Sequence, residues 1–222
     1  MNNIYKFTVL IAITLVLIGT FLVPIPVIPG LYDKARIIYL HVPMSWIAVL
    51  SFLLSMINSV QYLRKRDFIY DIRSNSAAEV GFLFTILATV TGSLWAKFNW
   101  GSYWNWDPRE TSIFILMLIY GAYFSLRSAI DNYEQKAKLA SVYAIIAFVT
   151  VPFFIFIMPR IVESLHPADS IVDSRGKITM DPVMLTIFLF SLFSFTLLFF
   201  WVLNVKIRME KLRFIRIQKN NI

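Results

Sequence analysis

Six long stretches without a charged residue constrain the fold of this chain more than any other feature of its sequence. Each is about as long as a helix that crosses the roughly 30 Å hydrocarbon core of a bilayer. Together with a few flanking residues, these stretches predict transmembrane helices at residues 7–29, 42–63, 78–96, 110–127, 139–159 and 182–205. We therefore expect an all-α integral membrane protein in which residues 1–222 form a single domain of six transmembrane helices.

Composition and charge support this expectation and predict an orientation. Of 222 residues, 58% are hydrophobic and 15% are charged, against about 25% charged in a typical soluble domain. Six spans place both termini on one side, and the segments on that side hold about twice as many Lys and Arg residues as the others. The positive-inside rule then makes both termini cytoplasmic. We attribute the net charge of +8 to this topology and not to nucleic-acid binding. We expect the basic C-terminal tail to contact anionic membrane lipid.

Metal-ligating residues are few in this sequence. It has no cysteine and two histidines, His41 and His166, so disulfides, thiolate metal sites and thioether-linked cofactors are excluded within the chain. A transition metal would have to be held by His, Met or carboxylate. The predicted topology places both histidines on the outer side, although they are far apart in the sequence.

Tryptophans are concentrated in residues 95–110, which hold four of the six in the chain: Trp95, Trp100, Trp104 and Trp106. One interpretation is an aromatic belt at the membrane–water interface. The other is a docking platform for a planar ligand, since aromatic faces stack on flat rings and interleaved Arg and Lys residues can pair with carboxylates. Asp107 and Pro108 are typical of the N-cap and first position of a helix, so we expect a helix to begin here.

The histidines and the tryptophans together favour haem. Two imidazoles that approach from opposite faces can complete the coordination of a haem iron, whose other four ligands come from the porphyrin. Taken singly, His41 would be read as an interfacial residue at a helix start and His166 as a solvated loop residue. Their predicted location on the same side as the tryptophan-rich segment favours an interfacial haem platform at the outer face.

Three segments of the chain resemble a known family. Residues 90–112, VTGSLWAKFNWGSYWNWDPRETS, resemble the tryptophan-rich "WWD" signature of haem-handling proteins in cytochrome c maturation, and among these the haem exporter protein C (CcmC) family. Residues 36–43, RIIYLHVP, and the pair Leu165–His166 resemble that family's two outer histidine regions. The size and the six predicted spans agree, so the resemblance covers essentially the whole chain.

The resemblance implies a multi-pass protein of the bacterial inner membrane that delivers haem and is not an enzyme. It would hold haem b at the periplasmic face and transfer it to the chaperone CcmE, with CcmD, CcmA and CcmB as partners. By motif position, the axial ligands would be His41 and His166, the propionate partners would be Arg36 and Arg109, and the platform would be Trp95, Trp100, Trp104, Trp106 and Asp107. Pro108 departs from the family pattern, which leaves the direction of Arg109 open.

Two other functions compete with haem delivery. The first is a bis-His haem b subunit of a membrane quinone oxidoreductase. Such subunits carry ligand histidines inside their spans, whereas neither histidine here lies inside an apolar run. The second is an assembly scaffold without a ligand, which would leave the two outer histidines and the tryptophan cluster unconnected.

Overall fold

A computed structural model describes residues 2–166 and 177–220 of the chain. These residues form helices and no β-strand, and six helices are long and apolar enough to cross a membrane. The prediction of an all-α six-span membrane protein is therefore confirmed. The elements are α1 (Asn3–Leu22), the 3-10 helix η1 (Tyr32–Ile37), α2 (Ile38–Lys65), α3 (Phe68–Trp100), α4 (Pro108–Ala129), α5 (Tyr133–Pro152), the π-helix η2 (Phe153–Ile157), α6 (Met158–Ile161) and α7 (Pro182–Asn220).

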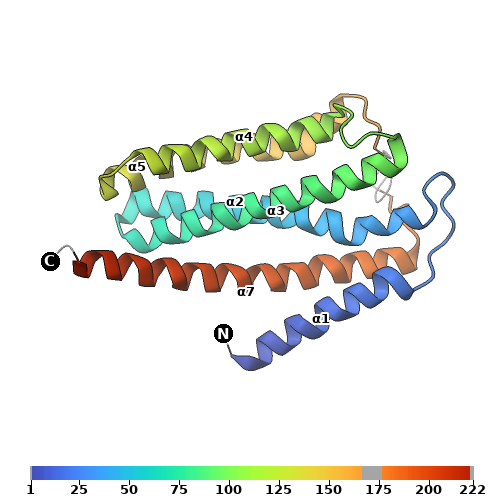
Figure 1. The fold of residues 1–222 in the computed structure, drawn as a ribbon, viewed down its shortest axis with the longest axis horizontal. Helices are drawn as coiled ribbons and strands as arrows, with labels where there is room; N and C mark the ends of the chain where they lie inside the picture. Colours follow the sequence, from blue (N-terminus) through green and yellow to red (C-terminus); the bar gives the residue numbers. More distant parts are fainter. Residues whose placement is uncertain (1, 167–176, 221–222) are drawn as a thin grey trace.

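The helices form an elongated bundle with α2 and α3 at its centre (Figure 1). Helices α4 and α5 lie on one side of this pair, and α7 followed by α1 lies on the other. Small residues allow close packing at the centre, as is common between membrane helices. A Cβ atom on Gly81 of α3 would come within 2.7 Å of the Phe52 ring of α2. The close approach of α2 and α3 therefore depends on glycine at position 81.

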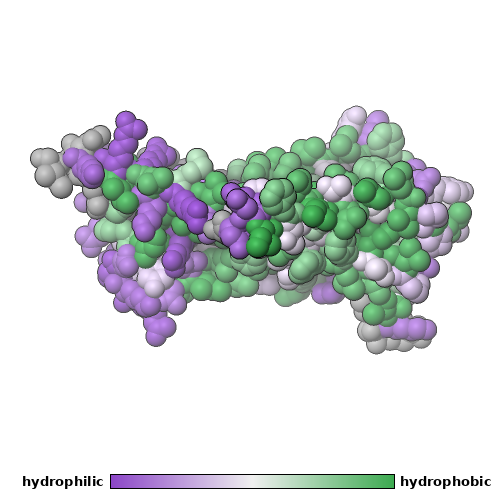
Figure 2. All heavy atoms as spheres, turned by 90° about the horizontal axis from the view of Figure 1, so that it is seen from below, coloured by the Kyte–Doolittle hydropathy of each residue, from purple (hydrophilic) through white to green (hydrophobic). Residues whose placement is uncertain are grey.

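The two ends of the bundle differ. Both termini lie toward the same end, on the left of Figure 1, and the segments that join α1 to α2 and α3 to α4 lie at the other. Figure 2 shows hydrophilic residues gathered most densely at the end with the C-terminus, and a broad hydrophobic surface along the middle. This pattern fits a helix bundle surrounded by lipid.

Helix boundaries follow local sequence signals more closely than they follow the apolar runs. Helix α1 ends at Leu22, before the predicted limit of 29, because Pro24 and Pro26 cannot donate the backbone hydrogen bonds of a continuing helix. Helix α3 begins at Phe68, where the Asp67 side chain accepts a hydrogen bond from the backbone N–H of Ile69 (2.9 Å). The polar first turns of α3 therefore precede the predicted span 78–96.

Helix α4 begins where the sequence predicts. Pro108 is its first residue and Asp107 is its N-cap, with a capping box completed by Glu110. Helix α3 ends at Trp100, and Gly101 follows in the left-handed conformation (φ 84°), which glycine adopts without steric cost. The tryptophan-rich segment is thus divided between the last turns of α3 and the connection to α4.

Candidate functional site

A cavity of about 420 Å³ lies at the end of the bundle away from the C-terminus. This volume is within the range of small-molecule sites, which are about 300–1,000 Å³. Its walls come from η1, α2, α3, α4, η2, α6 and the start of α7, and they are mainly apolar. Six of the polar or aromatic residues that line it are His41, Trp95, Trp100, Trp104, Arg109 and His166.

His41 enters the cavity from the first turn of α2. Its Nδ1 atom lies 3.0 Å from the hydroxyl oxygen of Thr91 on α3. Because that hydroxyl donates to the backbone oxygen of Leu87 (2.9 Å), we assign the proton to Nδ1, which then donates to Thr91. This tautomer leaves a lone pair on Nε2. The ring also packs on Gly92, where an added Cβ atom would lie 2.8 Å from His41 Cε1.

His166 reaches the same cavity from the segment after α6. Its Nδ1 atom lies 2.9 Å from Oδ1 of Asp107. Since an ionised carboxylate only accepts hydrogen bonds, Nδ1 carries the proton here too, and Nε2 keeps its lone pair. The ring stacks near Trp95 (centroids 6.0 Å apart, 28° between planes) and meets Trp100 edge-on (4.9 Å, 74°).

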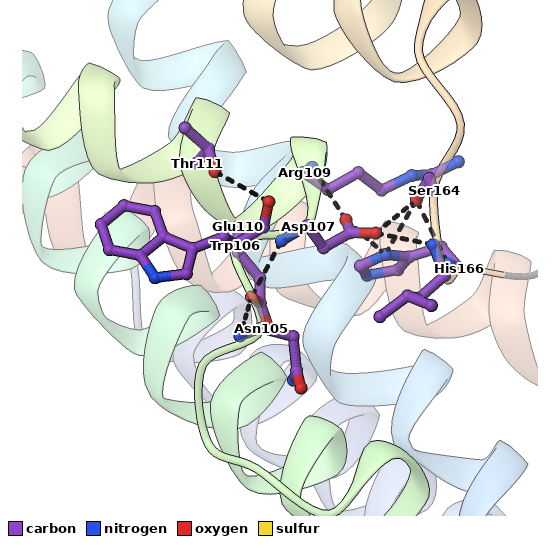
Figure 3. A network of polar contacts seen from close by, with 9 residues as sticks. Asn105, Trp106, Asp107, Arg109, Glu110, Thr111, Ser164 and His166 are labelled. Carbon is purple, nitrogen blue, oxygen red and sulfur yellow. Dashed lines mark hydrogen bonds and ion pairs between the residues drawn. The ribbon is translucent and has the colours of Figure 1, made fainter.

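Asp107 joins the tryptophan-rich segment to the His166 segment (Figure 3). Its side chain is fully buried, and its two oxygens accept from four donors. Oδ1 accepts from the Arg109 backbone N–H (2.9 Å) and from His166, whereas Oδ2 accepts from the Ser164 hydroxyl (2.8 Å) and the Leu165 N–H (2.7 Å). Burial raises the pKa of Asp107, but these donors outweigh burial and hold the pKa below its usual value. The carboxylate therefore stays ionised.

The electrostatics of His166 favour the neutral ring. Burial lowers its pKa, the Asp107 charge opposes that effect, and the Arg109 charge adds to the lowering. The net result is a pKa below the ordinary histidine value. At neutral pH the imidazole is therefore uncharged and able to ligate a metal.

The aromatic wall is made by three of the four clustered tryptophans. Trp95 and Trp100 lie near the end of α3 with their rings perpendicular (5.0 Å, 82°), and Trp95 Nε1 donates to the backbone oxygen of Lys34 (3.2 Å). Trp104 lines the cavity from the connection to α4. All three rings line the cavity, and their use as a platform for a planar ligand stays a prediction.

Trp106 is placed differently from the prediction of a four-ring platform. Its backbone is left-handed (φ 56°) and the residue is 71% exposed. The ring meets Trp104 edge-on (5.8 Å, 88°) and contributes to a second, apolar pocket with Phe114 and Met117. In Figure 3 it points away from His166. The unusual backbone conformation thus directs it out of the main cavity.

Of the two arginines predicted near the site, only Arg109 lines the cavity. The Arg36 guanidinium donates to the backbone oxygens of Thr20 (2.9 Å) and Val23 (2.7 Å) and pairs with Asp33 (3.0 Å). The last carbonyls of a helix lack intrahelical partners, and Arg36 supplies hydrogen bonds to such carbonyls at the end of α1. The structure does not bring Arg36 into the site.

The structure places at the site three residues to which the sequence analysis assigned no role there. Thr91 and Ser164 hold the two histidines by hydrogen bonds, directly or through Asp107, but single hydroxyl residues give no sequence signal. Arg160, which follows the π-helix η2, also lines the cavity. Pro152 and Pro159 flank η2, and such π-helical turns are frequent at functional sites, which makes this proline pair the signal that could have been used.

The protein offers few ligands for a bare metal ion. Over residues 2–166 and 177–220, no group of three His, Asp or Glu side chains converges on one point. Two imidazoles with free Nε2 atoms are available in the cavity instead. This donor set fits a metal that brings its other ligands with it, as iron does in a porphyrin.

Fold and site together define a polytopic membrane protein with a ligand cavity at one end, walled by tryptophans and carrying two histidines. The family model described as "Heme exporter protein C" matches residues 1–221 of the chain. Heme exporter protein C of Bradyrhizobium diazoefficiens is 32% identical over 207 residues, which cover 92% of this chain and 78% of the relative. The Escherichia coli K12 protein of the same name is 31% identical, covering 82% and 74%.

A plant relative extends the comparison. A putative cytochrome c biosynthesis ccmC-like mitochondrial protein of Marchantia polymorpha is 32% identical over 174 residues, which cover 78% of this chain and 73% of the relative. The match over nearly the whole chain settles the family. This chain belongs to the heme exporter protein C family.

Proposed function

We propose that this protein binds haem b at the periplasmic face of the bacterial inner membrane and transfers it to the chaperone CcmE during cytochrome c maturation. One observation carries the proposal. His41 and His166 line the same cavity, and each engages its Nδ1 atom in a hydrogen bond so that Nε2 keeps its lone pair. The family and the names of its members support haem as the cargo.

Each part of the site has a role in this proposal. The Nε2 atoms of His41 and His166 ligate the iron from its two faces. Trp95, Trp100 and Trp104 contact the porphyrin and set its orientation, and Arg109 pairs with a propionate. Asp107 fixes the tautomer and direction of His166, as carboxylates behind metal-bound histidines commonly do. The His166 side chain is 21% exposed, which leaves one side of the site accessible to an acceptor.

The orientation and the partners belong to the same proposal. Hydrophilic residues gather at the end of the bundle with the C-terminus, where the basic segment of α7 lies (Figure 2). This supports cytoplasmic termini, which put the cavity on the periplasmic side. CcmD and the transporter subunits CcmA and CcmB are the expected partners. The role is delivery of haem and not catalysis.

The decisive experiment is an absorption spectrum of the detergent-purified protein with ferric haem. Two histidine ligands predict a six-coordinate low-spin spectrum. His41→Ala and His166→Ala should each give a five-coordinate spectrum that added imidazole returns to six-coordinate. A double variant with the parent spectrum would contradict the ligation. Delivery is tested in cells by measuring haem bound to CcmE.

A quinone oxidoreductase subunit is not supported by the structure or the relatives. Both histidines lie at one end of the bundle, and the sequence has no third histidine for a second haem across the bilayer. The compared relatives carry names of haem export and cytochrome c biosynthesis. Reduction of the bound haem by a quinol would instead support a quinone oxidoreductase subunit.

A further inference from the structure

We propose that Arg160 acts with Arg109 as a clamp for the two carboxylates of the bound porphyrin, and so determines which edge of the ring faces this side of the cavity. The inference rests on the proposed function, because it takes haem as the ligand. It assigns to Arg160 the propionate-binding role that the family resemblance predicted for Arg36.

Arg160 is held at the cavity by its own turn of helix. It lies in the short helix α6, directly after the π-helix η2, and its Nη1 atom donates to the backbone oxygen of Phe156 (3.0 Å). That bond uses one of the five N–H donors of the guanidinium. Arg109 lines the same cavity from the first turn of α4. Among the described residues that line the cavity, these two are the only cations.

The two guanidinium groups lack an acidic partner. In the described part of the chain, no carboxylate oxygen lies within 4.0 Å of either one. The acidic side chains beside Arg109 in sequence are used elsewhere. Asp107 accepts from four donors, none of them a guanidinium. Glu110, which also lines the cavity, accepts from the backbone N–H groups of Asn105 (2.7 Å) and Asp107 (3.3 Å). Two guanidinium groups that line one cavity without a salt bridge to a carboxylate favour the binding of an anion.

Haem supplies the matching anion. Its two propionates extend from the same edge of the ring, and leaving them unpaired in a protein site is costly. Arginine pairs with a carboxylate through two parallel hydrogen bonds, so one arginine suits one propionate. With His41 and His166 fixing the iron, a pair of arginines at one edge removes the remaining freedom of the ring to turn about the iron–histidine axis.

Other cations at this end of the bundle are engaged elsewhere. Arg36 pairs with Asp33 and the end of α1. Lys97 donates to the backbone oxygen of Gly101 (2.9 Å) and lies over the Tyr103 ring. Neither lines the cavity. Lys97→Gln is therefore a matched control, since it removes one charge from the same end of the protein without touching the clamp.

The test compares ferric haem with haem dimethyl ester, whose propionates carry no charge. Both are titrated into the purified full-length protein in detergent, and binding is followed in the absorption spectrum. We expect the parent to bind haem at least tenfold more tightly than the ester. Arg160→Gln should weaken haem binding roughly tenfold, the effect of losing about one charge-assisted hydrogen bond, and leave ester binding unchanged.

The outcomes separate the clamp from the proposed function. Loss of the haem-over-ester preference in Arg160→Gln, with a six-coordinate spectrum retained and Lys97→Gln like the parent, supports the clamp. If Arg160→Gln keeps the full preference, Arg160 faces solvent or lipid phosphate and the clamp is wrong, although haem binding stands. If the variant weakens haem and ester equally, the residue only shapes the cavity and the clamp is also wrong. A parent that binds neither ligand overturns both proposals.

Discussion

The Nδ1 atom of His166 lies 2.9 Å from the Oδ1 atom of Asp107, although the two residues come from segments on either side of α4 and α5. Asp107 is at the same time the N-cap of α4. One carboxylate therefore starts a transmembrane helix, anchors the segment at Ser164 and Leu165, and orients a histidine of the cavity. A substitution at Asp107 should therefore also change the orientation of the His166 ring.

Asp107→Asn tests whether the Asp107 carboxylate is needed to orient His166 for haem binding. Asparagine is as good an N-cap as aspartate, so α4 should start normally. It offers one acceptor oxygen, whereas Asp107 accepts from four donors through two oxygens. We expect haem affinity to fall about 10–100-fold, as is typical when a carboxylate behind a ligating histidine is removed, with a larger high-spin fraction in the spectrum. Asp33→Asn, at an exposed carboxylate outside the cavity, is the control. Unchanged haem affinity and spin state in Asp107→Asn would show that His166 binds iron without the carboxylate of Asp107.

Gly92→Ala tests the position of His41. The added Cβ atom would lie 2.8 Å from His41 Cε1, closer than van der Waals contact allows, so the imidazole must move. We expect the loss of one axial ligand and a five-coordinate spectrum that added imidazole reverses. Gly121→Ala is the matched control, because a Cβ atom there meets nothing within 4 Å. Similar thermal unfolding of the two variants with a six-coordinate spectrum in both would contradict the prediction.

The pH dependence of His166 follows from its surroundings. Burial lowers its pKa below the ordinary value of about 6.5, so the apoprotein should titrate at this ring below pH 6.5. The Asp107 charge acts in the opposite direction. Asp107→Asn should therefore lower the pKa of His166 further. Ring-proton NMR of the labelled apoprotein measures both values, and an upward shift in the variant would contradict the assigned charge effect.

The same shift affects stability. Because the folded-state pKa of His166 is lowered, the unfolded chain takes up this proton first as pH falls. The contribution of the neutral ring to stability is therefore complete above about pH 6.5 and declines as pH drops toward the folded-state pKa. His166→Phe keeps a ring and removes the titration. We expect its thermal stability to fall less than that of the parent between pH 7 and pH 5, measured by circular dichroism in detergent.

Local signals made much of the fold and part of the site predictable. Long uncharged runs predict six helices, and Asp107 followed by Pro108 predicts the start of α4, because both depend only on neighbouring residues. That His41 and His166 meet at one end was predictable from topology alone, since span number decides the side on which each segment lies. These inferences needed no knowledge of side-chain direction.

Other parts of the site depend on side-chain direction and could not be predicted. Arg36 precedes His41 closely in sequence, yet it turns to the carbonyls at the end of α1, which become available only because α1 stops at Leu22. Trp106 leaves the cavity because of a left-handed backbone conformation, which is unusual for a bulky residue. The hydroxyls of Thr91 and Ser164 find their partners only after the helices pack.

The different positions of Trp104 and Trp106 allow a test that distinguishes haem binding from haem delivery. Trp104 lines the cavity, whereas Trp106 is 71% exposed and its ring contacts the Trp104 ring edge-on. Trp104→Ala should cost on the order of 1 kcal/mol of ring contact, or roughly fivefold in haem affinity, because two tryptophans and two ligands remain. Trp106→Ala should leave haem affinity unchanged. If the exposed ring meets the acceptor, the Trp106 variant should nevertheless deliver less haem to CcmE.

The measurement is co-purified haem and CcmE-bound haem in the same cells, with immunoblots to equalise protein levels. Delivery is sensitive to position, since a misplacement of about 1 Å can slow a transfer step roughly a hundredfold. We therefore expect Trp104→Ala to keep most of its haem and to deliver little of it. Trp106→Phe, which retains an aromatic ring, should restore the delivery that Trp106→Ala loses. Proportional loss of both haem pools in Trp104→Ala would mean that this ring serves binding alone, and normal delivery by Trp106→Ala would mean that the acceptor approaches by another surface.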